Sequence, residues 1–191
     1  MKVPAKVKKL AIQLFWAVIT LALLSLIVSI EAKTENISKS STTFNSSQIP
    51  QLLENIDGAL VDVVRVSDGD TLWIDHRGTE YKVRMIGINS NELQGDNGQP
   101  ECAAEDARER LTQLVEGKQV TFIFDDSQDR QDRYGRLLGY IERNNEDVGN
   151  ILIREGLAKE FTYRKAHSNQ SLYRASENTA QQKSLGIWSC Q

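Results

Sequence analysis

The sequence predicts an α+β domain of five strands and three helices, preceded by an N-terminal hydrophobic helix. Short runs rich in β-branched residues are separated by turn sequences, as is typical of strands. Apolar residues at helical spacing mark further segments, and the first of these lies between the third and fourth strands. Together, these two patterns predict the order three strands, a helix, two strands and two helices.

The first three strands are predicted at Ala59–Val66, Thr71–Ile74 and Glu80–Ile88. The connections between them, Ser67–Asp70 and Asp75–Gly78, are short and rich in Asp and Gly, which favour tight turns. Consecutive strands joined in this way form antiparallel hairpins.

The first helix is predicted at Cys102–Val115, where apolar residues form one stripe. These residues are Ala103, Ala107, Leu111 and Leu114. The elements that follow are strands at Val120–Phe124 and Leu137–Ile141 and helices at Val148–Glu155 and Gln170–Ser184. This order is that of a five-stranded OB-fold-like β-barrel with capping helices, although closure into a barrel does not follow from the pattern alone.

An apolar segment from Leu10 to Ile30 follows four lysines and is long enough to cross a bilayer. Residues 1–32 are therefore predicted to be a signal anchor, with its N-terminus in the cytoplasm, or a signal peptide that is cleaved. Either interpretation places the rest of the chain outside the cytoplasm, anchored to the membrane or secreted. Residues 33–55 are polar and are predicted to be a disordered linker, so that residues 56–191 form the folded domain.

The charge balance limits how the domain could bind nucleic acid. The 23 Lys and Arg against 26 Asp and Glu give a net charge of −3, and removing the four lysines and one glutamate of residues 1–32 leaves −6. Tight, sequence-independent DNA binders are normally basic, because neutralisation of phosphates drives their affinity. The sequence therefore argues against a DNA-coating protein. It is compatible with weak, local binding by a turnover enzyme, or with no nucleic-acid partner.

An ordered set of polar residues between Ser67 and Arg136 says most about function. The set consists of Asp68-Gly69-Asp70-Thr71, Arg84, Glu92 and Asp132-Arg133-Tyr134-Gly135-Arg136. Phosphodiester hydrolysis needs such parts: oxygen ligands for a cation, a base that activates water, and guanidinium groups for the phosphoryl oxygens. Taken singly, each residue also has an ordinary interpretation as a turn acid, a surface arginine or a solvated glutamate.

On these motifs, the chain resembles the thermonuclease (staphylococcal-nuclease-like) family from about Ala59 to Trp188. The resemblance implies a closed OB-fold barrel and calcium-dependent hydrolysis of DNA and RNA with little sequence preference, which leaves 3′-phosphate ends. It also implies that Arg84 and Arg136 clamp the scissile phosphate and that Glu92 is the general base. Planar guanidinium groups bind phosphate bidentately, which suits the charge of a pentacoordinate transition state.

The resemblance also implies supporting roles for neighbouring residues. Asp70 is expected to ligate calcium, with Asp68 as a supporting acid and Thr71 as a hydroxyl that bonds the turn. Asp132 is expected to organise its loop, and Tyr134 either packs or hydrogen-bonds near a phosphate.

The sequence departs from the family pattern in the metal half of the site. The family usually reads Asp-Thr-Pro-Glu or Asp-Ala-Pro-Glu where this chain reads Asn89-Ser90-Asn91-Glu92. Calcium would then be held by Asp70, the Asn89 side chain and the Ser90 backbone carbonyl, with one negative charge fewer, so we expect weaker binding. The missing proline is expected to free the loop that aims Glu92. The alternatives are a catalytically weakened binding module of the same fold at the cell envelope and a structural module with no ligand.

Cys102 and Cys190 are the two cysteines of the chain, and in an exported protein they form a plausible disulfide. His76 lies in a predicted turn and His167 in a polar loop, so both are expected to be solvated and non-catalytic. No His and Cys residues occur at metal-ligand spacing, so zinc is not expected. The domain is expected to be a monomer.

Overall fold

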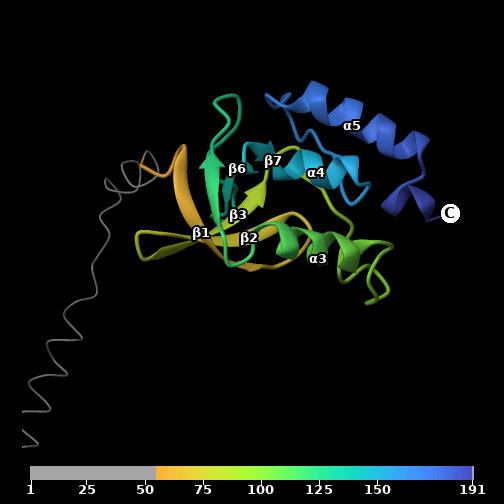
Figure 1. Cartoon of the computed structure of the whole chain (residues 1–191), viewed down its shortest axis with the longest axis horizontal. Coiled ribbons are helices and arrows are strands. Elements are labelled where there is room, and N and C mark those ends of the chain that lie inside the picture. The colour runs from red at the N-terminus through yellow and green to blue at the C-terminus, as the bar shows by residue number, and fades with distance from the viewer. Residues whose placement is uncertain (1–54, 191) are drawn as a thin grey trace, which may run out of the picture. The chain divides into compact units, whose positions relative to one another are not determined.

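The computed structural model describes residues 55–190 (Figure 1). The predicted N-terminal hydrophobic helix of residues 1–32 and all but the last residue of the predicted linker lie outside the described residues. Within residues 55–190, no helix combines the length and the apolar character needed to cross a membrane.

Five strands of the described chain form a closed barrel, which confirms the predicted barrel. They are β1 (Ala59–Val66), β2 (Thr71–His76), β3 (Thr79–Met85), β5 (Gln119–Ile123) and β6 (Leu137–Arg143). The pairing order is β3–β2–β1–β5–β6, and a parallel pairing of β3 with β6 closes the ring. Because successive side chains of a strand point to opposite faces, Leu72, Ile74 and Val83 face inwards and are fully buried.

The third predicted strand, Glu80–Ile88, is wrong in its last three residues. β3 ends at Met85, and the chain turns at Gly87, whose φ of +78° lies in the left-handed region that glycine adopts most readily. The short strand β4 (Ile88–Asn89) then leaves the barrel and pairs with β8 (Lys159–Glu160). This turn places Asn89 in a separate two-stranded sheet beside the barrel.

Three helices of the described chain gather on one side of the barrel (Figure 1). They are α3 (Ala104–Val115), α4 (Val148–Arg154) and α5 (Gln170–Gln182). Asp147 caps α4 by accepting a hydrogen bond from the amide of Asn150 at 3.0 Å. α3 begins later than predicted, because Ala103 has a φ of +59° and precedes the helix. The short elements β7 (Glu146–Asp147), β8 and the 3-10 helix η1 (Gly186–Ser189) were not predicted.

The apolar core continues from the barrel into the helices. Leu111 and Val115 of α3 and Leu152 of α4 are fully buried in the same cluster as the inward strand residues. The predicted stripe of α3 is confirmed at Ala107 and Leu111. At its end the stripe is shifted by one residue, since Val115 rather than Leu114 is fully buried.

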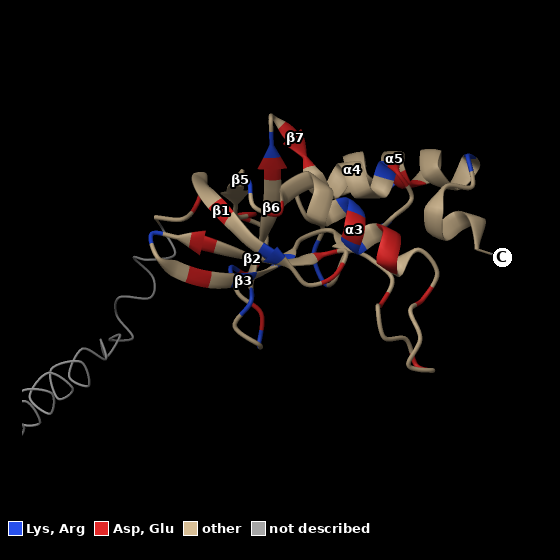
Figure 2. Ribbon diagram, turned by 60° about the horizontal axis from the view of Figure 1, so that its bottom comes forward, with Lys and Arg blue, Asp and Glu red and all other residues tan. Residues whose placement is uncertain are grey.

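Charged residues are distributed over the whole domain. Figure 2 shows acidic and basic residues interspersed along the strands and helices rather than gathered on one face. This distribution agrees with the modest negative net charge, and it leaves any attraction for phosphate to local groups.

Candidate active site

The candidate site begins at the turn between β1 and β2, which brings Asp68 and Asp70 close together. The Asp68 carboxylate accepts a hydrogen bond from the Asp70 amide at 3.1 Å. The Met85 amide donates to the Asp70 carbonyl at 2.9 Å, which ties the turn to the end of β3. Only glycine fits between the two acids, because a Cβ at Gly69 would lie 2.6 Å from the Cβ of Ser90.

The Asp70 carboxylate is 6% exposed and is met by several donors. Thr71 Oγ1 donates to Asp70 Oδ1 at 3.0 Å. The amide and the hydroxyl of Ser90 donate to Oδ2 at 3.0 Å and 3.3 Å. Arg84 Nη2 forms an ion pair with the same oxygen at 3.0 Å. The structure therefore brings Asp70, Thr71, Arg84 and Ser90 into direct contact.

Arg84 also contacts Asn89. Its Nη2 donates to Asn89 Oδ1 at 3.0 Å, and its Nη1 donates to the Met85 carbonyl at 2.7 Å. Oxygens of Asp70 and Asn89 thus converge on one positively charged nitrogen. The two side chains are therefore close enough to face a single positively charged group together.

The electrostatics of the turn also suit a cation. Burial raises the pKa of Asp68 to about 6, and the neighbouring charge of Asp70 adds to this effect. Within residues 55–190, no group of three or more His, Cys, Asp or Glu side chains is arranged to hold a metal ion. A cation at this turn would therefore need further oxygen donors besides such side chains.

Arg136 lies directly before β6 and is held by Asp132. The Asp132 carboxylate accepts hydrogen bonds from the Tyr134 amide at 2.9 Å and the Arg136 amide at 3.0 Å. Its second oxygen accepts from Arg136 Nε at 2.6 Å. Burial raises the pKa of Asp132, but the hydrogen bonds from Arg136 and Tyr134 outweigh it and lower the pKa. Asp132 therefore stays ionised and orients Arg136 through Nε.

The barrel register brings the start of β6, which Arg136 directly precedes, beside the end of β3, which carries Arg84. β3 and β6 are parallel neighbours, and Arg84 lies opposite Leu138. Arg136 precedes Leu138 by two residues and lies directly before the first residue of β6. Two guanidinium groups in this region could contact one phosphate.

Exposed aromatic rings lie among arginines next to Arg136. The ring of Tyr134, 69% exposed, lies 4.7 Å from Cζ of Arg133 and 5.8 Å from Cζ of Arg136. Phe161 and Tyr163 are also exposed, with ring centres 6.5 Å apart. The Arg133 pKa is raised, chiefly by the hydrogen bond to Tyr134 and less by Tyr163. Sequence reasoning assigned no role to Phe161 or Tyr163, although alternating aromatic and basic residues could have indicated one.

Glu92 follows the Asn89–Ser90 segment directly, and its side chain is exposed. Its amide donates to Glu101 Oε2 at 2.9 Å, and its carbonyl accepts from the Glu101 amide at 2.9 Å. Among the described residues, the Glu92 carboxylate has no hydrogen-bond or ion-pair partner. The backbone at Glu92 is thus fixed while its carboxylate remains available.

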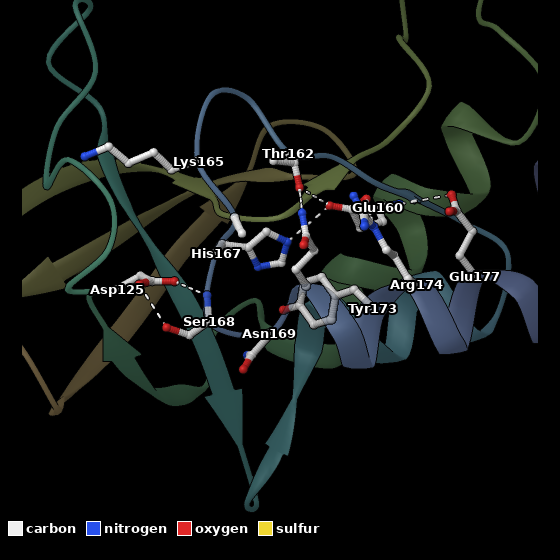
Figure 3. A network of polar contacts seen from close by, with 12 residues as sticks. Asp125, Glu160, Thr162, Lys165, His167, Ser168, Asn169, Tyr173, Arg174 and Glu177 are labelled. Atoms are coloured by element: carbon white, nitrogen blue, oxygen red, sulfur yellow. Dashed lines mark hydrogen bonds and ion pairs between the residues drawn. The ribbon is translucent and has the colours of Figure 1, made fainter.

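The expectation that His167 is solvated is wrong. The side chain is buried, with Nδ1 3.0 Å from the Tyr140 hydroxyl and Nε2 3.4 Å from Glu160 Oε1 (Figure 3). The ring packs on Gly87, where a Cβ would lie 2.4 Å from Cε1. His76 likewise lies at the end of β2 rather than in a turn, and it is partly buried. The neighbours of His167 in sequence are polar, so only its distant partners explain its burial.

Asp125 anchors the other side of this polar network (Figure 3). It accepts hydrogen bonds from the Tyr140 hydroxyl at 2.6 Å and the Ser168 amide at 2.7 Å. Burial raises the Asp125 pKa, but these donors outweigh burial and hold the pKa well below its usual range. The network includes Glu160 of β8, and β8 pairs with Asn89. It therefore supports the strand that carries Asn89.

Cys102 and Cys190 form a disulfide, with Cα atoms 6.3 Å apart, which confirms the predicted pairing. Cys102 precedes α3, and Cys190 follows η1. The bond therefore joins the segment after Glu92 to the C-terminal end of the described chain.

Comparison with known sequences gives one family and several relatives. The sequence pattern described as "Staphylococcal nuclease homologue" matches residues 82–190. That segment includes Arg84, Asn89, Glu92 and Arg136, and it extends through the disulfide to Cys190.

Similar proteins cover most of the described domain. The SPbeta prophage-derived endonuclease YokF of Bacillus subtilis (strain 168) is 34% identical over 133 residues, which are 68% of this chain and 45% of that protein. The thermonuclease of Staphylococcus hyicus is 30% identical over 137 residues, or 72% of this chain and 80% of that protein. Endonuclease YncB of Bacillus subtilis (strain 168) is 32% identical over 130 residues, or 68% and 61%. The chain thus spans less than half of the first relative and less than two thirds of the third.

Proposed function

Because this chain belongs to the staphylococcal nuclease homologue family, we propose that it is a nuclease that hydrolyses phosphodiester bonds of DNA and RNA. Relatives that match the same domain are named thermonuclease or endonuclease. The observation that carries the proposal is the convergence of Asp70 and Asn89 on Arg84, with Arg136 directly before the neighbouring strand β6. A cation and a phosphate could be bound side by side there.

Calcium is the cation that we assign to this site. Asp70, the Asn89 amide oxygen and the Ser90 carbonyl would hold it, since carboxylate, amide and backbone oxygens are the usual ligands of calcium. When bound, the ion supplies positive charge that polarises a phosphoryl oxygen.

The reaction that we assign begins with Glu92 as general base. Glu92 takes a proton from a water molecule whose oxygen attacks phosphorus in line. A bond between phosphorus and the water oxygen forms on that side, and the bond to the 5′ oxygen breaks. The 5′ oxygen takes a proton from solvent water and leaves as a hydroxyl, and the other product keeps a 3′-phosphate. Arg84 and Arg136 donate hydrogen bonds to the phosphoryl oxygens, whose negative charge grows in the transition state. Because Asp132 engages Arg136 through Nε, the two Nη groups of Arg136 are available for phosphate.

The surface next to Arg136 supports a preference for unpaired strands. Tyr134, Phe161 and Tyr163 offer exposed rings among arginines, and stacking of bases on such rings tolerates any sequence. Local contacts of this kind suit low sequence specificity. They also suit the weak overall affinity that a net charge of −6 after residue 32 predicts.

Two substitutions test the assigned mechanism. Glu92→Gln and Arg136→Ala should each lower calcium-dependent cleavage of DNA by about a hundredfold or more, because one loses the base and the other a phosphate contact. Arg154→Ala is the matched control, since Arg154 is exposed on α4 and makes only a 3.9 Å ion pair with Glu146. Circular dichroism should show that all three variants are folded. Full cleavage by both site variants would exclude this mechanism.

A catalytically weakened binding module of the same fold is the second candidate, and Asn89 is the observation that favours it. Asn89 contributes no charge to the cation site, and ligand charge controls calcium affinity. This candidate predicts no cleavage at millimolar calcium and no gain from Asn89→Asp. A calcium titration of DNA cleavage separates the two candidates.

We also propose that the domain acts outside the cytoplasm, as a monomer that is anchored by residues 1–32 or secreted after their cleavage. The N-terminal lysines and apolar run support export, and the disulfide suits an oxidising compartment. Millimolar calcium, which weak sites can use, would serve the site there. The mass of the mature protein, measured after membrane fractionation, distinguishes anchor from signal peptide.

A further inference from the structure

The segment that carries Glu92 is closed at its base by two hydrogen bonds between Glu92 and Glu101. Glu92 and Glu101 exchange two bonds: the Glu92 amide donates to the Glu101 carboxylate, and the Glu101 amide donates to the Glu92 carbonyl, both at 2.9 Å. Inside this closure, the Gly95 amide donates to the Gln99 carbonyl at 2.9 Å. The chain between Glu92 and Glu101 is therefore a hairpin-like loop, and Glu101 fixes the position at which Glu92 leaves it.

A second contact holds the residue before Glu92. Asn91 Nδ2 donates to the carbonyl of Cys102 at 2.8 Å. Asn91 stands where the resembling family has proline, which limits backbone freedom through its ring. Here a side-chain bond to Cys102 limits the same position.

Cys102 is in turn tied to a C-terminal segment that is itself anchored. The disulfide joins it to Cys190, directly after η1. η1 packs closely on the chain after α4: the Ile187 amide donates to the Gly156 carbonyl at 2.9 Å, and Ile187 is buried. A Cβ at Gly156 would lie 2.3 Å from the Leu185 carbonyl oxygen, so the two segments touch through their backbones.

The segment that follows α4 also holds Asn89 in place. Gly156 is followed by β8, whose Lys159 pairs with Asn89. The Lys159 ammonium lies 5.5 Å from the ring centre of Trp188 in η1. The segment from Asn89 to Cys102 is therefore fixed at both ends to the segment that runs from Gly156 to β8. Asn89 is fixed by strand pairing, and Cys102 by the disulfide and η1.

We propose that Asn91, Glu101 and the Cys102–Cys190 disulfide are positioning residues that hold Glu92 for catalysis, an inference that rests on the proposed nuclease function. The disulfide does more than restrict the unfolded chain, because its Cys102 end contacts Asn91 and adjoins Glu101. Breaking the disulfide releases one end of the segment while the Asn89 end stays paired. The alignment of the general base Glu92 should suffer more than phosphate binding, since Arg84 lies in β3 and Arg136 lies directly before β6.

The first test compares the unmodified full chain with two variants of it, Cys102→Ser/Cys190→Ser and Glu101→Ala. Each change should lower kcat for DNA cleavage by about tenfold or more, while KM changes by less than about twofold, because small misplacement of a catalytic group is costly. Glu101→Gln should recover most of the rate, since its amide oxygen can accept the Glu92 amide. Arg110→Ala is the matched control for general loss of stability. This change removes the ion pair between Arg110 of α3 and Glu155, which are 2.7 Å apart, and leaves the Glu92 segment untouched.

The second test does not depend on cleavage. In the double serine variant, hydrogen exchange at the amides of Glu92 and Glu101 should accelerate about tenfold or more, through an opening that costs less free energy than the global unfolding reported by amides of β2 and β3. Unchanged exchange at both amides would overturn the proposal. Variants whose kcat equals that of the unmodified chain would also overturn it. A rise in KM as large as the fall in kcat, or an equal effect of Arg110→Ala, would show a structural role only. If the unmodified chain failed to cleave DNA, the proposed function would fall. The exchange result would then decide by itself whether the disulfide holds the segment.

Discussion

At the scale of single residues, Asn89 sets the charge available to a cation. Its amide oxygen lies 3.0 Å from Arg84 Nη2, the nitrogen that also contacts Asp70. An aspartate at this position would place a second carboxylate, besides that of Asp70, next to Arg84 Nη2. The two side chains have nearly the same shape, so charge is the property that differs between them.

Asn89→Asp should therefore tighten calcium binding. We expect the half-saturating calcium concentration for DNA cleavage to fall by about tenfold, because added ligand charge raises calcium affinity. A calcium titration of cleavage measures this, and calorimetry with calcium alone measures it without substrate. Asn145→Asp, in the exposed turn after β6, adds the same charge elsewhere and should change neither value. An unchanged calcium dependence in Asn89→Asp would show that residue 89 is not a ligand.

Gly87 is required for two reasons that can be separated. Its φ is +78°, and a Cβ there would lie 2.4 Å from the His167 ring. Gly87→Ala should lower the free energy of unfolding by about 3 kcal/mol, from backbone strain together with the displaced ring. Gly78→Ala is the control, because Gly78 has a φ of +81° but open space around a Cβ, and it should cost about 1 kcal/mol. Equal losses in urea denaturation would show that contact with His167 contributes nothing.

At the scale of elements, the buried polar network joins the end of β5 to β6 and the segment after β8. Asp125 receives the Tyr140 hydroxyl and the Ser168 amide, and His167 links Tyr140 to Glu160. Each of these contacts joins residues from different elements. The network therefore stabilises the arrangement of elements, and through β8 it stabilises the pairing of Asn89.

This network should make stability depend on pH. The Asp125 pKa is lower in the folded chain than in the unfolded chain, so ionised Asp125 favours folding. Its contribution should be present above about pH 5 and be lost as the pH falls through about 4 towards the depressed folded-state value. The free energy of unfolding of the unmodified chain should thus fall more steeply below pH 5 than that of Asp125→Asn. Asp126→Asn, at the exposed neighbouring position, should keep the steep dependence. Parallel curves for Asp125→Asn and the unmodified chain would contradict this assignment.

At the scale of the whole molecule, the disulfide connects residues 88 positions apart and closes most of the domain into one covalent loop. A cross-link of this span restricts the unfolded chain strongly. On the chain-entropy account it contributes about 4–5 kcal/mol to the free energy of unfolding.

Cys102→Ser/Cys190→Ser should accordingly lower the free energy of unfolding by about 2–5 kcal/mol in urea denaturation. The unmodified chain in a strong thiol reductant should give the same value as the variant, since both lack the bond. A variant as stable as the oxidised chain would show that the disulfide restricts the unfolded state little.

The local elements follow from the sequence because their causes are local. Ala59–Val66 is the same strand in the pattern and in the structure, and α4 and α5 begin at the predicted residues. Alternation, apolar stripes and turn residues act within a few positions of the chain. The set of acids, arginines and Glu92 was likewise visible as an ordered motif, and two cysteines left one possible pair.

The geometry of the site depends on contacts between segments that are distant in the sequence, and no local pattern encodes such contacts. Closure of the barrel brings the start of β6, which Arg136 precedes, beside Arg84 of β3. The turn at Gly87 sends Asn89 to β8 rather than along β3. His167 is buried because partners from other elements surround it, although its neighbours in sequence are polar. The sequence by itself thus determined which groups are available for phosphodiester chemistry and which elements carry them. Only the tertiary structure decided which of these groups meet, because strand register and packing act between segments that are far apart in the chain.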